Sequence, residues 1–326
     1  MIERTFVVLD ICLPVFAFIA FGKLLSWRGL IREREHDFLN WIVYYMALPA
    51  LIFGAVSRQS PGNFLNLPFW VSSLAPPLVA AALFMGLARL LRLHGATAAA
   101  WVFGCFWANV TYMGLPLAER AFGSRGLELA AVYNAVMIPI FVVLGFSLIS
   151  IYTGTRDERL VHRLKRAFVN PIVGSAILGV LVSVLHEFTQ GAAQQSPPRI
   201  LAAAMRISYA VVDLAGQMGL PLALMLIGAS LRFKALRGHG LALVGVVAGK
   251  VLLVPALALL CIRLVYPDMS REVSGTVVLL SAMPNAVAAY VVAKRMGIDE
   301  SFVASMLVVS SICSIITIPI WLLVVL

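Results

Sequence analysis

The sequence predicts an all-α polytopic membrane protein of ten transmembrane helices, arranged as two inverted five-helix repeats. Three observations predict this fold. Of the 326 residues, 61% are hydrophobic and only 12% are charged, and the mean hydropathy is +0.96. Apolar runs of about 20 residues, which is the length of a membrane-spanning helix, recur along the whole chain. Two of these runs are interrupted at corresponding places in the two halves, as in many secondary transporters.

The spans can be placed in chain order, with short polar or basic connections between them. The first apolar run continues past Pro14 to Leu25 without a signal-peptidase site, so we interpret it as a span and not as a signal peptide. The expected spans are 5–25, 37–57, 68–91, 99–122, 127–152, 170–188, 207–231, 240–264, 273–296 and 301–325.

The distribution of Lys and Arg predicts the orientation in the membrane. Sixteen of these residues lie in or beside the connections after odd-numbered spans, and eight lie at the N-terminus and the other connections. The positive-inside rule therefore places both termini on the outer, periplasmic side of a bacterial inner membrane. Orientation also accounts for the net charge of +10, so no nucleic-acid partner is expected.

A near-constant spacing between similar segments indicates an internal repeat. Met46-Ala-Leu-Pro49 is echoed by Met218-Gly-Leu-Pro221, 172 residues later, and Gly123 is echoed by Gly297 after 174 residues. With five spans in each half, the second half must enter the membrane from the opposite side. We therefore expect repeats over 1–152 and 170–326, joined by a short basic cytoplasmic loop over 153–169.

The interrupted segments are 108–123 (ANVTYMGLPLAERAFG) and 281–297 (SAMPNAVAAYVVAKRMG). Proline removes a backbone donor and crowds the preceding turn, so a helix in lipid breaks there only where protein or water satisfies the freed carbonyls. We expect Pro116, Pro284 and Gly114 to lie where the two helices are broken and cross. The second half of a broken helix exposes unpaired N–H groups and a positive dipole end, which favour an anion.

Asparagines supply the candidate binding groups. Asn109 and Asn285 lie 176 positions apart, one in each interrupted segment. Their amides can donate to a carboxylate without a fixed charge at mid-membrane. Asn134 lies 25 residues after Asn109, and the same step from Asn285 reaches Ser310. The alternative is that these groups hold helices together, each bond contributing about 1 kcal/mol or less.

Lys250 is the one basic residue placed well inside a predicted span. An intramembrane charge is a functional hypothesis by default, so Lys250 is a candidate for attracting the anion or carrying a coupling proton. Alternatively, its long side chain extends to the membrane interface or pairs with a carboxylate such as Asp10 or Asp213.

The sequence lacks the motifs of enzymes and nucleotide-driven pumps. The sequence has no zinc-protease, nucleophile-elbow, phosphate-loop or dinucleotide motif, and its histidines lie in or near connections without ligand spacing. Cys12, Cys105, Cys261 and Cys313 are scattered singly. We therefore expect no enzyme activity, no metal and no cofactor, and we favour a gradient-driven or facilitative carrier over a pump.

The two interrupted segments, the LPALIFGA and LPLALMLIGASL motifs and the ten-span length resemble the auxin efflux carrier family. The loop over 153–169 is short, as in the compact bacterial members named as malonate and other organic-acid permeases, and unlike the long loop of the plant carriers. The resemblance covers essentially the whole chain. It implies that spans 4 and 9 cross, that spans 3–5 and 8–10 form a moving transport domain, and that spans 1, 2, 6 and 7 form a scaffold that dimerises. It also implies that Asn109, Asn134 and Asn285 line the substrate pocket.

The predicted function is secondary transport of a small organic anion, such as a dicarboxylate or an auxin-like carboxylic acid, by elevator-like alternating access. Two alternatives remain open: a sodium-coupled organic-anion symporter of the bile-acid type, and a membrane sensor that binds a ligand without moving it. Acidic residues are missing from the centres of both interrupted segments. Proton coupling or uniport is therefore favoured over sodium coupling.

Overall fold

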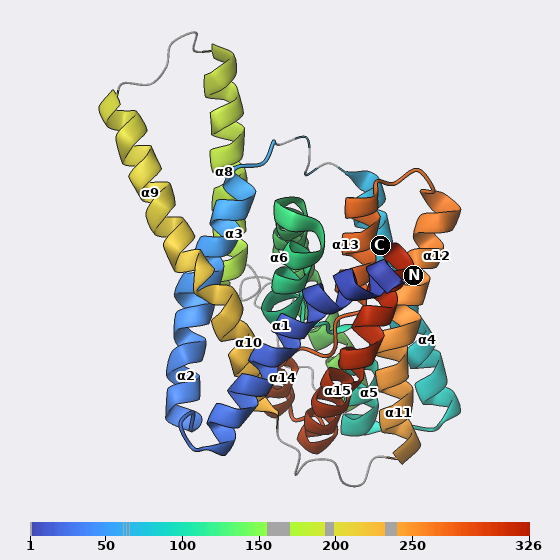
Figure 1. The fold of residues 1–326 in the computed structure, drawn as a ribbon. Coiled ribbons are helices and arrows are strands. Elements are labelled where there is room, and N and C mark those ends of the chain that lie inside the picture. Colours follow the sequence, from blue (N-terminus) through green and yellow to red (C-terminus); the bar gives the residue numbers. More distant parts are fainter. Residues whose placement is uncertain are drawn as a thin grey trace.

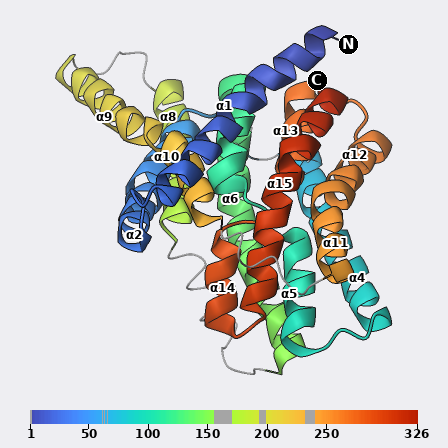
Figure 2. The same cartoon turned by 60° about the horizontal axis from the view of Figure 1, so that its bottom comes forward.

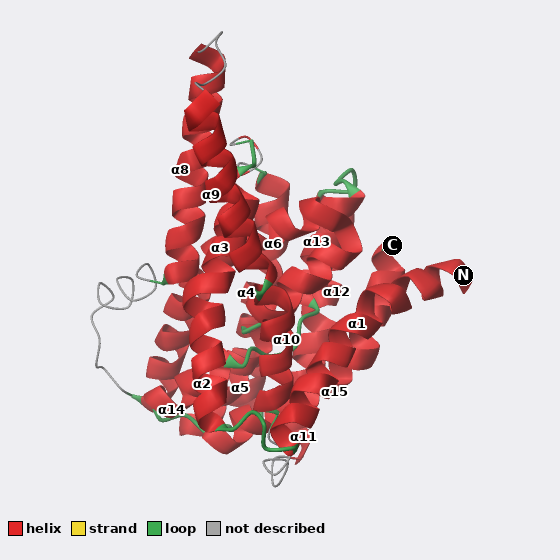
Figure 3. Ribbon diagram, turned by 60° about the vertical axis from the view of Figure 1, so that its left-hand side comes forward, coloured by secondary structure: helices red, strands yellow, loops and turns green. Residues whose placement is uncertain are grey.

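The computed structural model describes residues 2–60, 62, 64, 66–154, 170–192, 199–231 and 240–326. This part of the chain is almost entirely helical (Figures 1 and 3). It contains eight helical stretches long and apolar enough to cross a membrane. The all-α, multi-pass membrane class predicted from the sequence is therefore confirmed. The basic loop predicted over 153–169 lies, apart from its first two residues, outside the described residues.

The described helices differ in length because several are interrupted. In chain order they are α1 (Ile2–Trp27), α2 (Glu33–Ile42), α3 (Leu48–Ser57), α4 (Leu67–Leu90), α5 (Gly95–Phe106), α6 (Leu115–Thr153), α8 (Pro171–Ala192), α9 (Arg199–Gln217), α10 (Gly219–Ser230), α11 (Gly240–Ala248), α12 (Val254–Val265), α13 (Arg271–Ser281), α14 (Ala288–Met296) and α15 (Glu300–Val325). The π-helical turns η1 (Val43–Ala47), η3 (Val110–Gly114) and η5 (Gly249–Leu253) precede α3, α6 and α12.

Each of these π-helical turns ends two residues before a proline: Pro49 after η1, Pro116 after η3 and Pro255 after η5. A proline ring inside an α-helix collides with the carbonyl four residues earlier and leaves it without a donor. Widening the preceding turn relieves this conflict, because the helix continues through longer-range bonds such as Leu115 N–H to the Val110 carbonyl. The prolines thus reshape these helices without ending them.

Helix starts are set by side-chain caps in the expected way. The side chains of Asn66, Ser270 and Asp299 accept hydrogen bonds from the backbone N–H groups of the first turns of α4, α13 and α15. The N–H of Ile172, in the first turn of α8, donates to Asn170 Oδ1.

Gly123 divides α6 into two antiparallel helical pieces. Its backbone (φ 62°, ψ −154°) lies in a region that is open essentially to glycine alone. A Cβ atom on Gly126 would meet the backbone carbonyl of Ala118, eight residues earlier, which is only compatible with a sharp reversal. The predicted connection over 123–126 is therefore a tight turn between two helical pieces.

Two helix pairs pack with their backbones in contact. α1 packs along α10, and α3 packs along α8 (Figures 1 and 2). A Cβ atom on Gly22 of α1 would lie 2.0 Å from the carbonyl oxygen of Met225, and one on Gly228 of α10 would lie 1.8 Å from the carbonyl oxygen of Ile19. On the other pair, a Cβ atom on Gly179 would lie 2.9 Å from Val56 Cβ. Small residues allow this close approach in membranes.

Arg120 connects α6 to the kinked α1. Pro14 has no N–H, so the carbonyl of Asp10, four residues earlier, cannot form its helical bond. Arg120 Nη2 donates to this carbonyl at 2.8 Å, and Nε donates to the Ile11 carbonyl at 3.1 Å. The guanidinium therefore replaces the donor that the proline removes.

Candidate functional site

The two interrupted helices cross in the interior of the molecule. α5 ends at Phe106 and α13 ends at Ser281. Between the halves, the chain segments run antiparallel: the N–H of Asn109 donates to the Pro284 carbonyl (2.8 Å), and the N–H of Ala286 donates to the Trp107 carbonyl (3.2 Å). The second halves, η3–α6 and α14, both start beside this crossing, so their N-terminal ends converge on it.

Asn285 is fully buried at the crossing. Its backbone N–H donates to Ser310 Oγ of α15 at 3.1 Å, and its Nδ2 donates to the Gly104 carbonyl of α5 at 2.6 Å. Within the described residues, its Oδ1 is buried without a hydrogen-bond partner. Asn285 therefore satisfies the carbonyl end of α5 and keeps one acceptor unused.

Asn109 begins η3, and its side chain is 2% exposed. Its carbonyl accepts hydrogen bonds from the N–H groups of Met113 and Gly114, and these are the first hydrogen bonds of the π-helical turn. Among the residues that the structure describes, its Nδ2 has no hydrogen-bond partner. A buried polar atom without a partner is rare in proteins and calls for an explanation, such as a bound water or ligand. The unused donor on Asn109 suits a carboxylate oxygen, and the unused acceptor on Asn285 suits the hydroxyl of a protonated carboxyl group or another donor on the ligand.

Asn134 and Ser310 also lie in this region, but both are engaged within the protein. Asn134, on the second piece of α6, accepts a hydrogen bond from Thr111 Oγ1 at 2.7 Å and donates to the Ala130 carbonyl at 3.0 Å. Ser310 accepts from Asn285 and donates to the Leu307 carbonyl at 3.3 Å. Each therefore positions one of the two interrupted segments.

The predicted crossing residues are placed differently from one another. Pro284 lies in the crossing, where its carbonyl accepts the Asn109 N–H. Gly114 lies at the end of η3, where an added Cβ would come within 3.0 Å of Leu280 on α13. Pro116 lies in the first turn of α6, beyond the break. The expectation that Pro116 lies at the crossing is therefore corrected. The interruption precedes Asn109, and the π-helical turn accommodates Pro116.

Lys250 lies in η5 and is 1% exposed, so it does not extend to the membrane interface. Its Nζ donates to the carbonyl of Ser281, the last residue of α13, at 2.7 Å. The carboxylates proposed as partners lie elsewhere: Asp213 pairs with Arg58 at 2.8 Å, and Lys250 forms no ion pair with a carboxylate of the described chain.

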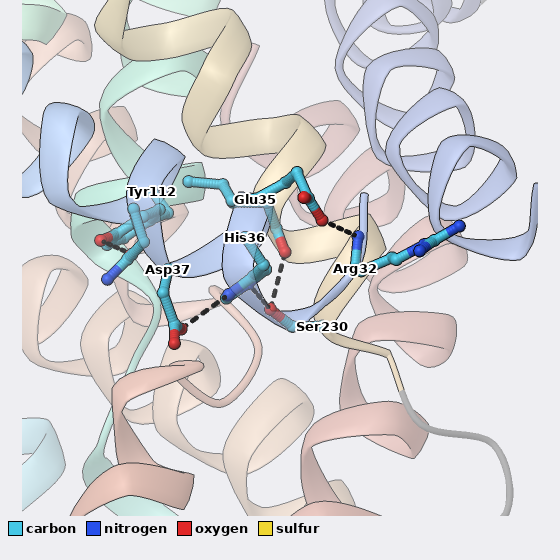
Figure 4. A network of polar contacts seen from close by, with 8 residues as sticks. Arg32, Glu35, His36, Asp37, Tyr112 and Ser230 are labelled. Atoms are coloured by element: carbon cyan, nitrogen blue, oxygen red, sulfur yellow. Dashed lines mark hydrogen bonds and ion pairs between the residues drawn. The ribbon is translucent and has the colours of Figure 1, made fainter. Parts of the chain in front are cut away.

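Polar contacts that sequence reasoning missed connect η3 and α10 to α2 (Figure 4). Tyr112 Oη of η3 donates to Asn40 Oδ1 at 2.8 Å. His36 Nε2 lies 2.8 Å from Ser230 Oγ of α10. Tyr112 lies three residues after Asn109 inside the interrupted segment, which is the signal that could have indicated it.

Comparisons with known proteins identify the family. The family model described as membrane transport protein matches residues 7–322. The chain belongs to this family. It is the auxin efflux carrier family, so the resemblance inferred from the interrupted segments is confirmed. The chain is therefore a multi-pass membrane transporter, a class that generally lacks enzyme activity.

The relatives cover nearly the full length of the chain. An "Uncharacterized transporter" of Methanothermobacter thermautotrophicus is 26% identical over 95% of each chain. A "Putative malonate transporter" of Rhizobium meliloti is 24% identical over 94% of this chain and 92% of its own. A second "Uncharacterized transporter", from Methanocaldococcus jannaschii, is 23% identical over 96% of this chain and 97% of its own.

Proposed function

We propose that this membrane transporter is a secondary carrier of a small organic anion, such as a dicarboxylate or an auxin-like carboxylic acid. The observation that carries the proposal is the crossing itself. Two helix N-terminal ends converge on a buried point where Asn109 Nδ2 and Asn285 Oδ1 have no partner among the described residues. The malonate assignment in the name of one relative supports the same substrate class.

The chemistry of the crossing suits a carboxylate. Unpaired N–H groups and the positive dipole ends of η3 and α14 favour negative charge, while the asparagine amides fix its orientation. Neutral amides avoid the cost of holding two fixed cations at mid-membrane. Asn134 and Ser310, which contact the two interrupted segments, complete the proposed site as positioning groups.

We further propose that the chain forms ten spans in two inverted repeats. The turn at Gly123 makes two spans of α6, and the broken pairs α5–η3 and α13–α14 each belong to one span. The pairing of α1 with α10 is mirrored by the pairing of α8 with α3, as a repeat requires. Ala47 and Gly219, at equivalent positions of the two Met-x-Leu-Pro motifs, lie against each other.

In this proposal, α4–α6 and α11–α15 form the moving transport domain, and α1–α3 with α8–α10 form a scaffold that dimerises in a bacterial inner membrane. The termini lie at the same end of the molecule (Figure 2), which fits an even number of crossings with both termini on the periplasmic side. The hydrogen bond from Arg120 to α1 and the hydrogen bond from Tyr112 to Asn40 then join the two domains. Elevator-like displacement must break such contacts.

The test is uptake of radiolabelled malonate into proteoliposomes. Asn109→Ala removes the free donor, and we expect at least a tenfold loss of uptake at subsaturating substrate, because a charge-assisted hydrogen bond contributes about 1.5–3 kcal/mol. Asn285→Ala removes the free acceptor and the donor to the Gly104 carbonyl, and we expect it to lower uptake as well. The control is Asn66→Ala, which removes an amide at the cap of α4 and should cost about 1 kcal/mol of stability without changing substrate affinity.

Two results would contradict the proposal. Unchanged malonate uptake in both crossing variants would exclude the pocket assignment. If wild-type protein gave no saturable flux with any dicarboxylate or aromatic carboxylate, yet its melting temperature rose with one of them, the protein would be a sensor and not a carrier.

A further inference from the structure

The two asparagines at the crossing expose opposite free groups. Asn109 leaves a buried donor, Nδ2, without a hydrogen-bond partner in the described chain, and Asn285 leaves a buried acceptor, Oδ1. Both residues are at most 2% exposed. A molecule that satisfies both groups must offer an acceptor to Asn109 and a donor to Asn285.

The orientation of the Asn285 amide follows from its neighbours at the end of α5. One end of the amide lies 2.6 Å from the Gly104 carbonyl oxygen and 3.5 Å from the Trp107 carbonyl oxygen. Carbonyl oxygens only accept hydrogen bonds, so this end must be the NH2 group, because an amide rotated by half a turn would place oxygen against oxygen. The free end of Asn285 is therefore the acceptor Oδ1, which only a donor can satisfy.

The donors beside Asn285 are engaged elsewhere. Its backbone N–H donates to Ser310 Oγ at 3.1 Å, and the Ser310 hydroxyl donates to the Leu307 carbonyl at 3.3 Å. The N–H of Ala286 donates to the Trp107 carbonyl at 3.2 Å. Burying an acceptor without a donor is unfavourable. A donor on a bound molecule would remove this penalty, so the crossing favours a ligand that carries one.

We propose that Asn285 Oδ1 is a specificity-determining acceptor, and that the transported anion carries a hydrogen-bond donor beside its carboxylate. The inference rests on the proposed transport function and narrows its substrate class. A hydroxy acid carries such a donor in its hydroxyl group, and a dicarboxylate carries one in its half-protonated form. In both cases the ligand enters with a single negative charge, which suits a crossing whose two asparagine side chains are neutral.

The first test compares competitors on the wild type. 3-Hydroxypropionate and 3-fluoropropionate differ only by a hydroxyl group against a fluorine atom, which cannot donate. Malonamate and monomethyl malonate differ by an amide NH2 group against a methoxy group. All four carry one negative charge near neutral pH, so charge is matched within each pair. Each is added at increasing concentration to proteoliposomes that take up radiolabelled malonate.

We expect the donor-bearing member of at least one pair to inhibit at a concentration at least about tenfold lower than its partner, because the other leaves Oδ1 unpaired. Discrimination within the malonamate pair identifies a half-protonated dicarboxylate. Discrimination confined to the hydroxypropionate pair identifies a hydroxy acid. Ratios within about twofold in both pairs would overturn the inference, while saturable malonate uptake left the transport function intact. Absence of saturable uptake of both malonate and radiolabelled 3-hydroxypropionate would refute the transport function itself.

Two variants assign the discrimination to one amide. Asn285→Ala removes the acceptor, so the members of the discriminating pair should then inhibit within about twofold of each other. Asn109→Ala is the matched control, because it removes a donor to the carboxylate that all four competitors share; all should weaken alike and the ratio should be retained. A ratio retained in Asn285→Ala, or lost in Asn109→Ala, would contradict the assignment. If Asn285→Ala failed to fold, the wild-type comparison would still decide whether the ligand needs a donor.

Discussion

The backbone contact between α1 and α10 gives a prediction with a calculable strain. A Cβ atom on Gly22 would lie 2.6 Å from the Cα and carbonyl carbon of Met225, whereas ordinary contacts begin at 3.4 Å. The nearest atom to this Cβ is the carbonyl oxygen of Met225, at 2.0 Å, so Gly22→Ala forces the helices apart by more than about 1 Å. Gly228→Ala, whose Cβ would lie 1.8 Å from the Ile19 carbonyl oxygen, forces a similar separation. Such overpacking costs about 1–3 kcal/mol, and separating the helices also weakens dispersion contacts along the whole pair.

The assay is thermal unfolding of purified protein in detergent, followed by tryptophan fluorescence. Each variant should lower the melting temperature by about 5 °C, because 1 kcal/mol corresponds to about 2–4 °C for a chain of this kind. The double variant should lose less than the sum, since one separation accommodates both methyl groups. Gly86→Ala in α4 is the control, because nothing lies within 4 Å of its added Cβ. Equal melting temperatures for Gly228→Ala and Gly86→Ala would refute the backbone contact.

Two further substitutions test contacts between the proposed domains. Arg120→Met should lower the free energy of unfolding by about 1–3 kcal/mol, because it leaves the Asp10 carbonyl without a donor. The same change should cost less in a Pro14→Ala background, where the helix supplies its own N–H. Equal losses of stability in both backgrounds would contradict this reasoning. Tyr112→Phe removes the hydrogen bond to Asn40 and should change the maximal rate of malonate flux severalfold at constant KM. Initial rates over a range of malonate concentrations would show this. A change confined to KM would instead place Tyr112 in substrate binding.

The sequence was sufficient to predict an all-α membrane protein, because repeated apolar runs of this length require a lipid environment. It also identified the two interrupted segments, since an asparagine and a proline within an apolar run conflict with a continuous helix in lipid. The break in the first segment was misplaced towards Pro116. Widening of the preceding turn accommodates a proline, and no local pattern distinguishes a widened turn from a true break.

The partners of the charged residues could not be predicted, because they are set by contacts between distant parts of the chain. Lys250 binds a backbone carbonyl 31 residues away, and a carbonyl has no sequence signature. Arg120 binds backbone carbonyls more than 100 residues earlier. Only Pro14 indicated that a free carbonyl existed there, and nothing in the sequence indicated which donor would meet it.

The antiparallel backbone pairing at the crossing has a consequence for the proposed alternating access. Because residues from opposite halves of the chain share backbone hydrogen bonds there, displacing one interrupted helix along the membrane normal carries the other with it. In the proposed carrier, access would therefore not change by separation of the two interrupted segments at this point. The amide protons of Asn109 and Ala286 should consequently exchange slowly with deuterated solvent in the inward-facing and outward-facing forms alike.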